Sequence, residues 1–306
     1  MPTAQWQWQF DAPTGTYKNH FLSEKMYTYA VEKAVFMDFV RPVEGYGKHK
    51  GDTVTLVRVK QLTEPTSASL NEGQRISEDT FTINTKTVTP VELGRAVPYT
   101  SLAQDFSRWD IENPIQSALM DQMRLVLDTK ASTAFQTAQV KYIPTGLAAG
   151  TFDTDGTAST SATENMNVFH AEEIRDYLFD TIRAPTFEGD DYVGIFRTLG
   201  LRGIKRDPDF DEWHKYTDPQ AKFNSEVGKL ESIRFIETNH SNALSKVGNS
   251  SVLGEGVVFG KDAVVMAEVL SPELRAAIPG DFGRSKAVAW YGILEFTIVW
   301  DTANAG

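Results

Sequence analysis

Carboxylates with metal-ligand spacing are the first candidates for chemistry in this sequence. Asp207, Asp209 and Asp211 occupy alternate positions, as the first three acids of a calcium-binding loop do. Glu212 stands where such a loop needs glycine, and Asp218 stands where a bidentate glutamate would close the site. The pattern therefore favours a solvated acidic turn, and the three aspartates stay only as a candidate calcium site.

Motifs for phosphate binding and hydrolysis are incomplete or missing. Gly254, Gly256 and Gly260 resemble a dinucleotide-binding loop, but the third glycine is one position late. We interpret them as turn glycines around a short strand. The sequence has no Walker-type phosphate loop, no G-x-S-x-G elbow and no H-E-x-x-H pair. It therefore predicts no catalytic residue, no cofactor and no enzymatic activity.

Composition narrows the class of protein further. The 306 residues include no cysteine, which excludes disulfides, thiolate metal sites and cysteine nucleophiles and fits a reducing cytoplasm. No apolar run approaches the roughly 18 residues that a membrane span needs, and the N-terminal residues do not resemble a signal peptide. The net charge is −11, although residues 1–60 carry +2. An acidic chain is a poor sequence-specific DNA binder, but it can lie beside packed DNA.

The N-terminal residues alternate in a way that calls for a docking surface. Trp6, Trp8 and Phe10 fall on one face of a predicted strand, and each can bury roughly 150–250 Å². That surface is either the chain's own domain or a neighbouring chain. From about Phe21 to Val40 the apolar spacing predicts a helix, which Arg41-Pro42 would end.

A long hairpin is predicted next. Residues 53–60 and 80–92 are rich in β-branched residues and are predicted to be its two arms. The polar stretch Gln61–Asp79 between them predicts a wide tip. A two-stranded hairpin is marginally stable alone, and the large apolar groups here are mainly Phe81 and Ile83. The hairpin is therefore expected to need a partner surface, from its own domain or another subunit.

The clearest helix follows the hairpin. Asn113 is predicted as its N-cap, with Pro114 at the first helical position and Gln116 completing the spacing of a capping box. Apolar residues then recur every four positions over about 26 residues, which corresponds to a rod of roughly 40 Å. A rod of this length is typical of a scaffold that spans a molecule.

The second half of the chain mixes helices and strands. A loop at 152–165, rich in Gly, Ser, Thr and Asp, predicts a boundary between lobes. Beyond it the patterns predict an α+β fold, with the following elements. Helices are expected at 168–183 and 199–206, and strands at 191–196, 232–237, 256–260 and 287–301.

This order of elements resembles the Hong Kong 97 capsid fold of tailed bacteriophages. Two segments are similar to coat proteins of the phage-N-four type: Leu93–Thr100, which follows the hairpin, and Glu226–Thr238, which ends in an arginine-bearing strand. Ser232 departs from the pattern, because a glycine is expected before that strand. The resemblance covers roughly residues 20–301.

The resemblance implies a major capsid protein with an N-terminal arm, an E-loop hairpin, a peripheral domain with a spine helix, and an axial domain. The corresponding ranges are 1–50 for the arm and first helix, 51–97 for the E-loop, 98–150 for the peripheral domain with its spine at about 113–139, 151–265 for the axial domain, and 266–306 for strands returning to the peripheral domain.

Such a protein is expected to form pentamers and hexamers of itself in the virion, after assembly in the host cytoplasm. A separate scaffolding protein, a portal, a decoration protein and non-specifically packaged double-stranded DNA are the other expected partners, with no membrane. Contacts between subunits are expected at the following residues: Trp6, Trp8, Phe10, Glu64, Asn71, Phe81 and Ile83.

Three alternatives stay open at this point. A cellular encapsulin shell would share the fold but enclose an enzyme. A tail or baseplate protein would form fibres or rings from similar threonine-rich strands. A monomeric α+β enzyme could assemble its site from scattered residues.

Overall fold

The structure is a computed structural model, and it describes residues 32–59, 62, 64–65, 68–70, 72–73, 75–107, 110–208, 226–278 and 281–299. Met1–Val31 and Glu32–Gly306 are separate units, and all elements named below belong to the second. Predictions for the following residues lie outside the described ranges: Trp6, Trp8, Phe10, Asn71, Asp209 and Asp211.

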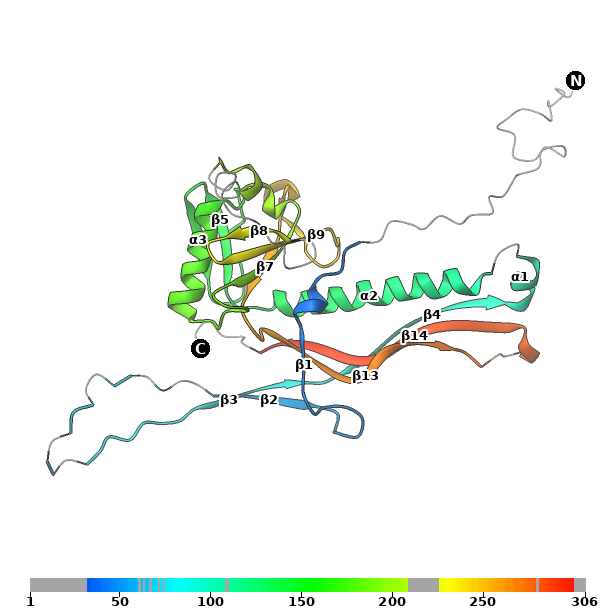
Figure 1. The fold of residues 1–306 in the computed structure, drawn as a ribbon, viewed down its shortest axis with the longest axis horizontal. Coiled ribbons are helices and arrows are strands. Elements are labelled where there is room, and N and C mark those ends of the chain that lie inside the picture. The colour runs from blue at the N-terminus through cyan, green and yellow to red at the C-terminus, as the bar shows by residue number, and fades with distance from the viewer. Residues whose placement is uncertain are drawn as a thin grey trace, which may run out of the picture. The chain divides into compact units, whose positions relative to one another are not determined.

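A four-stranded sheet backed by one long helix forms the first lobe (Figure 1). Its order is β1 (Arg41–Pro42), β13 (Val264–Ala276), β14 (Ser285–Ile298) and β4 (Val91–Thr100). β1 runs parallel to β13, whereas the other neighbours are antiparallel. Every second residue of β14 from Val288 to Ile298 is buried, as the period of a half-covered strand requires.

The long helix α2 (Glu112–Gln136) covers that sheet. Leu119 from the helix and Trp290 from β14 share one core cluster, and the indole Nε1–H of Trp290 donates to Gln122 Oε1 at 3.3 Å. Because the indole is buried and its polar atom is paired, it fixes the helix on the sheet without a desolvation penalty.

The predicted start of this helix was wrong by a few residues. The helix begins at Glu112, and Asn113 lies inside it instead of capping it. The Asp110 carboxylate accepts the Glu112 backbone N–H at 3.1 Å and the Asn113 side-chain amide at 2.5 Å. The N-cap position is Ile111, whose side chain makes no capping bond, and the Asp110 carboxylate one residue earlier accepts the first helical N–H instead. Pro114 becomes the third helical residue, where the missing N–H has no intrahelical partner to lose.

A smaller mixed sheet forms the second lobe. Its order is β12 (Gly256–Phe259), β7 (Tyr192–Arg197), β9 (Ile233–Thr238) and β8 (Glu226–Leu230), with β7 parallel to β9. α3 (Val168–Asp176) continues into a π-helical turn, η2 (Tyr177–Ile182). The α+β class predicted from the sequence is confirmed, as are the strands expected at 191–196, 232–237 and 256–260.

Two predicted helices are replaced by shorter turns. Within the described part of 21–40 there is one 3-10 turn, η1 (Phe36–Phe39), and Arg41-Pro42 forms β1. The stretch 199–206 folds as two 3-10 turns, η3 (Gly200–Arg202) and η4 (Ile204–Arg206). In both places buried contacts with other elements override the helical periodicity.

The remaining short elements complete the chain. β2 (Val54–Val59) pairs with β3 (Ile83–Val88), β5 (Lys141–Gly146) with β6 (Ala149–Asp153), and β10 (Lys246–Val247) with β11 (Leu253–Gly254). The short helix α1 (Ser101–Phe106) follows β4, and η5 (Asn249–Ser251) and η6 (Asp281–Gly283) are single turns. No helix among the described residues is long and apolar enough to cross a membrane.

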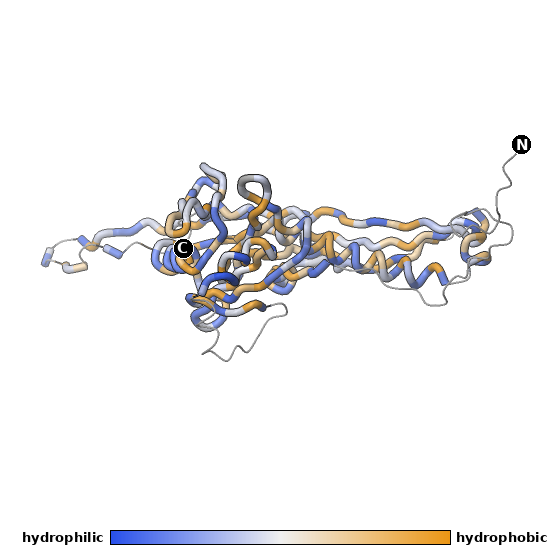
Figure 2. The backbone as a smooth tube through the Cα atoms, turned by 90° about the horizontal axis from the view of Figure 1, so that it is seen from above, coloured by the Kyte–Doolittle hydropathy of each residue, from blue (hydrophilic) through white to orange (hydrophobic). Residues whose placement is uncertain are grey.

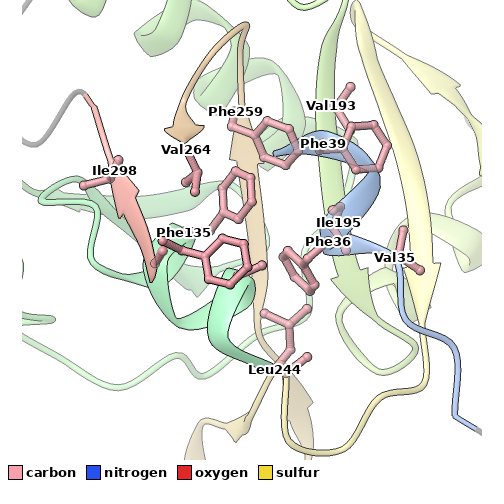
Figure 3. Packing of buried hydrophobic residues seen from close by; sticks show 14 of the residues in the cluster. Val35, Phe36, Phe39, Phe135, Val193, Ile195, Leu244, Phe259, Val264 and Ile298 are labelled. Carbon is pink, nitrogen blue, oxygen red and sulfur yellow. The ribbon is translucent and has the colours of Figure 1, made fainter. Parts of the chain in front are cut away.

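One hydrophobic cluster joins the two lobes (Figure 3). The Phe135 ring, near the end of α2, lies 5.7 Å from Phe36 and 4.5 Å from Phe259, measured between centroids. Val193 and Ile195 of β7 and Ile298 of β14 belong to the same cluster. The lobes therefore share a core, and η1 is part of it.

The two-residue turn between β8 and β9 explains why a glycine is expected before β9. Leu230 pairs with Ile233, and the two residues between them, Glu231 and Ser232, have φ of 47° and 58°. This is the geometry of a type I′ turn, which glycine adopts at least cost. Ser232 therefore stands, in place of the expected glycine, at a position where the backbone is left-handed.

Replacing Ser232 by glycine is expected to stabilise the chain. Relief of the left-handed strain, less the backbone entropy of glycine, gives about 0.5–1 kcal/mol of unfolding free energy. Urea unfolding followed by circular dichroism measures this difference. S77G, in the exposed hairpin, serves as the control, and a destabilised S232G chain would contradict the turn geometry.

Of the three glycines Gly254, Gly256 and Gly260, Gly256 comes closest to a buried aromatic ring. A Cβ there would lie 1.9 Å from Cδ1 of Phe196, which is buried and cannot swing away. G256A is therefore expected to cost about 1–3 kcal/mol of unfolding free energy. G47A, where a Cβ meets nothing within 4 Å, is the matched control. Equal melting temperatures for the two variants would show that the sheet yields at this point.

Candidate assembly surface

The β2–β3 ribbon is a two-stranded antiparallel sheet of its own. Its register sets Val59 opposite Ile83 and Val57 opposite Thr85. Directly opposed residues of an antiparallel pair point to the same face. The ribbon therefore has one face with Val57, Val59, Ile83 and Thr85, and a second face made by the residues between them.

The first face is apolar and open to solvent. The side chains of Val57, Val59 and Ile83 are 62%, 54% and 54% exposed, and the threonines beside them are exposed as well. Val54 and Leu56 on the second face are half-buried, and Val88 is buried. The ribbon thus uses one face to lie on its own chain, and its other face is left for something else.

Beyond the strands the hairpin is mostly hydrophilic, with separate hydrophobic residues in it (Figure 2). Phe81, predicted as a contact residue, is 57% exposed, and the predicted contact Glu64 is exposed too. Other large apolar side chains that are at least half exposed in this stretch are Leu62, Leu70 and Ile76. Isolated apolar side chains are ordinary on a surface, but a row of them along one hairpin favours a binding role.

Sequence reasoning found only half of this surface. It selected Phe81 and Ile83 on the second arm and overlooked Val57 and Val59 on the first. Apolar residues stand at both even and odd positions of the stretch Val54–Val59, so both faces of this strand carry apolar side chains. A strand with two apolar faces needs cover on both. That signal was present in the sequence.

A second exposed apolar group lies at the far end of the first lobe. Phe106 of α1 and Phe282 of η6 are 84% and 105% exposed, and Leu102 and Ile278 are exposed beside them in the chain. The Ser101 N–H donates to the Arg284 carbonyl at 3.0 Å, which brings α1 and η6 together. No pattern in the sequence pointed to this group, which we call the tip patch (Leu102, Phe106, Ile278, Phe282).

The candidate calcium loop is described only at Asp207. Its Oδ2 accepts the Val168 backbone N–H at 3.4 Å at the start of α3, which is a structural role. Among the residues that the structure describes, no group of three or more His, Asp and Glu side chains could hold a metal ion.

The sequence matches no family model and no curated protein. Solved structures match over nearly the whole chain. The capsid of cyanophage P-SCSP1u has a TM-score of 0.66 at 11% identity, over 94% of this chain and 92% of that one. The capsid of Ralstonia phage GP4 gives 0.66 at 14% identity, over 95% and 93%, and that of cyanophage Pam1 gives 0.66 at 14%, over 97% and 96%.

The chain has the fold of tailed-phage capsid proteins. The capsid fold expected from the order of elements is thereby confirmed, although so little sequence identity remains. The names spine helix for α2 and E-loop for the β2–β3 ribbon follow from the resemblance alone and stay predictions. The division into five domain ranges stays a prediction.

Proposed function

We propose that this chain is the major capsid protein of a tailed phage and builds a closed icosahedral shell from pentamers and hexamers of itself. The observation that carries the proposal is the ribbon of Val57, Val59 and Ile83, whose open apolar face suits a neighbouring subunit. The match to phage capsid structures over more than nine-tenths of both chains supports it.

The physical logic is that of many modest contacts. Burying one large aliphatic side chain contributes roughly 1.5–3 kcal/mol. One ribbon face and one tip patch per subunit therefore give weak pairs. In a closed symmetric assembly every subunit makes these contacts at once, and the shell becomes stable as a whole.

Other partners follow from the same proposal. A scaffolding protein and a portal would guide assembly in the host cytoplasm, and a decoration protein could cover the finished virion. The packaged double-stranded DNA would lie against the shell without sequence-specific contacts, because the chain carries a net charge of −11.

Expression of the chain alone, followed by negative-stain electron microscopy and light scattering, tests the proposal. Closed shells, or pentamers and hexamers that convert to them, are the expected result. A monodisperse monomer that persists with salt, crowding agent and a candidate scaffold would overturn it. Fibres or open rings would favour a tail or baseplate protein, and shells that enclose an enzyme would favour an encapsulin.

A further inference from the structure

A partly open cavity of about 740 Å³ lies beside the junction of the two lobes. The end of α2, the β5–β6 hairpin, α3 with η2, and strands β7 and β12 all contribute to its wall. Much of the wall is apolar, and one side is aromatic: Phe152 lies between Tyr142 and Tyr177, with centroid distances of 4.6 Å and 4.2 Å. A space of this size is in the range of binding pockets.

Strand β12 meets this cavity with its edge. All four of its residues line the cavity, together with Glu255 before it and Gly260 and Lys261 after it. Successive residues of a strand point to opposite faces, so a cavity over one face would touch only alternate residues. Both faces are also covered already, because Val257 packs against the cluster at the lobe junction and Val258 against the cluster of the second lobe. The cavity therefore runs along the edge.

This edge offers backbone hydrogen-bonding groups to the cavity. β12 is the last strand of its sheet, with β7 as its neighbour. The Glu255 carbonyl accepts the Arg197 N–H at 3.0 Å, and every second residue of an antiparallel strand bonds to the same neighbour. The N–H and C=O groups of Gly256 and Val258 therefore point away from β7. Within the described part of the chain, no residue outside the sheet bonds to these four groups.

The two ends of the edge differ in charge. Lys261 and Arg183 both line the cavity, and the Lys261 N–H donates to the Pro185 carbonyl at 3.0 Å, which brings their two segments together. Glu255 lines the cavity at the opposite end of β12, and Glu164 lines it as well. At about 3.3 Å per residue, positions 255 and 261 are roughly 20 Å apart. A ligand along β12 thus meets a carboxylate at one end and cations at the other.

We propose that this cavity binds an extended peptide segment of a partner protein, which adds to the sheet as a strand beside β12. An extended peptide supplies N–H and C=O groups at the spacing that Gly256 and Val258 require. Its central side chains are β-branched or aromatic and cover the rings of the wall, and its ends place an acidic residue beside Lys261 and a basic residue beside Glu255. A small apolar molecule would leave the backbone groups of this edge without partners.

The site is separate from the surfaces that the assembly proposal uses. None of the residues that carry it belongs to the β2–β3 ribbon or to the tip patch. Binding can therefore be measured on the unassembled chain, and its outcome does not depend on whether shells form.

Fluorescence anisotropy with a labelled seven-residue peptide, Glu-Val-Thr-Val-Thr-Val-Lys, tests the proposal. Two further peptides carry N-methyl groups on alternate residues, one at the even and one at the odd central positions, so each lacks the N–H donors of one edge. One of them is expected to bind about tenfold more weakly than the parent peptide, because hydrogen bonds to β12 are lost, and the other about equally. Equal binding by all three peptides, or no binding of the parent at about 1 mM, would overturn the proposal.

Variants of the chain test the same contact from the other side. V258P removes an N–H that points into the cavity while the bonds to β7 are made by its neighbours, so peptide binding is expected to weaken about tenfold. K261E is expected to weaken binding about fivefold, and a peptide with lysine in place of the first glutamate is expected to restore it. K50E, in an exposed turn away from the cavity, is the charge control and is expected to bind unchanged.

Circular dichroism melting verifies that each variant is folded before its affinity is compared. Affinities of V258P and K261E equal to that of the unchanged chain would overturn the proposal. Self-association of the chain that V258P and K261E both abolish would show that the strand comes from a second copy, and would overturn its assignment to a partner protein.

Discussion

Deletion of Gln61–Asp79 is expected to leave a folded, soluble chain that forms no shells. The deleted residues lie outside both arms of the ribbon, so the pairing of Val59 with Ile83 can be closed by a short turn. The hydrophobic core clusters of the described residues include no residue of the deleted stretch. The variant should therefore keep its fold but lose the part of the hairpin that contacts a neighbouring subunit.

Sedimentation and electron microscopy measure the loss of shells, and circular dichroism measures the retained fold. Replacing Gln61–Asp79 by a glycine–serine stretch of equal length is the matched control for length. If the apolar side chains Leu62, Leu70 and Ile76 matter, the replacement is expected to fail in assembly as the deletion does. Intact shells from the deletion variant would remove the hairpin from the assembly mechanism.

A smaller change isolates the ribbon face. V59T together with I83T keeps two β-branched residues at one cross-strand pair but removes apolar surface from the open face. This double variant is expected to raise the concentration needed for assembly at least tenfold, since each subunit loses roughly 1–2 kcal/mol of contact energy. T87S on the same face is the control, because it removes a methyl group beside the patch.

Local patterns predicted the elements whose environment is simple. The alternation along β14 and the four-residue repeat of α2 could be recognised because each faces one core. The 3-10 turns at 199–206 could not be predicted, because they depend on distant neighbours. A Cβ at Gly203 would lie 2.2 Å from the Met166 carbonyl oxygen, so these turns pack against a distant segment more closely than a residue with a side chain could.

The assembly surface was only partly predictable for a related reason. Whether Val57 faces solvent depends on which face of the ribbon its own chain covers, and the sequence does not state that. The tip patch depends on the pairing of β4 with β14, which brings α1 beside η6 across a long stretch of chain. Exposed apolar residues from segments far apart in the sequence become a patch only through the fold.

Asp128 accounts for the largest stability effect that we expect from a single side chain in the described part of the chain. It lies on α2 and is completely buried. Its Oδ1 accepts the backbone N–H groups of Val35 and Phe36 at 2.8 Å and 2.7 Å. Its Oδ2 lies 2.8 Å from Nδ1 of His240, which is buried as well. One carboxylate thus joins three separate segments of the chain.

The neighbouring bonds show what this carboxylate holds in place. The Lys33 N–H donates to Asn239 Oδ1 at 2.6 Å, and the Thr238 hydroxyl donates to the Lys33 carbonyl at 2.9 Å. The first described residues are therefore fastened to α2 on one side and to the second lobe on the other. This also explains why the described part of the predicted helix is not α-helical, because the N–H groups of Val35 and Phe36 donate to Asp128 instead of to backbone carbonyls.

D128A is expected to lower the free energy of unfolding by about 3–5 kcal/mol, because two backbone N–H groups and one imidazole lose their partner in a buried site. D128N is expected to cost less, about 1–2 kcal/mol, since its oxygen still accepts both N–H groups and its amide can donate to a neutral His240. Urea unfolding of the unassembled chain, with T133A on the exposed side of α2 as control, measures both. A loss for D128A no greater than that for T133A would mean that the first described segment is held by its hydrophobic contacts alone. The predicted order, with D128A below D128N and T133A near the unchanged chain, would show that the carboxylate holds the segment with Val35 and Phe36 against α2.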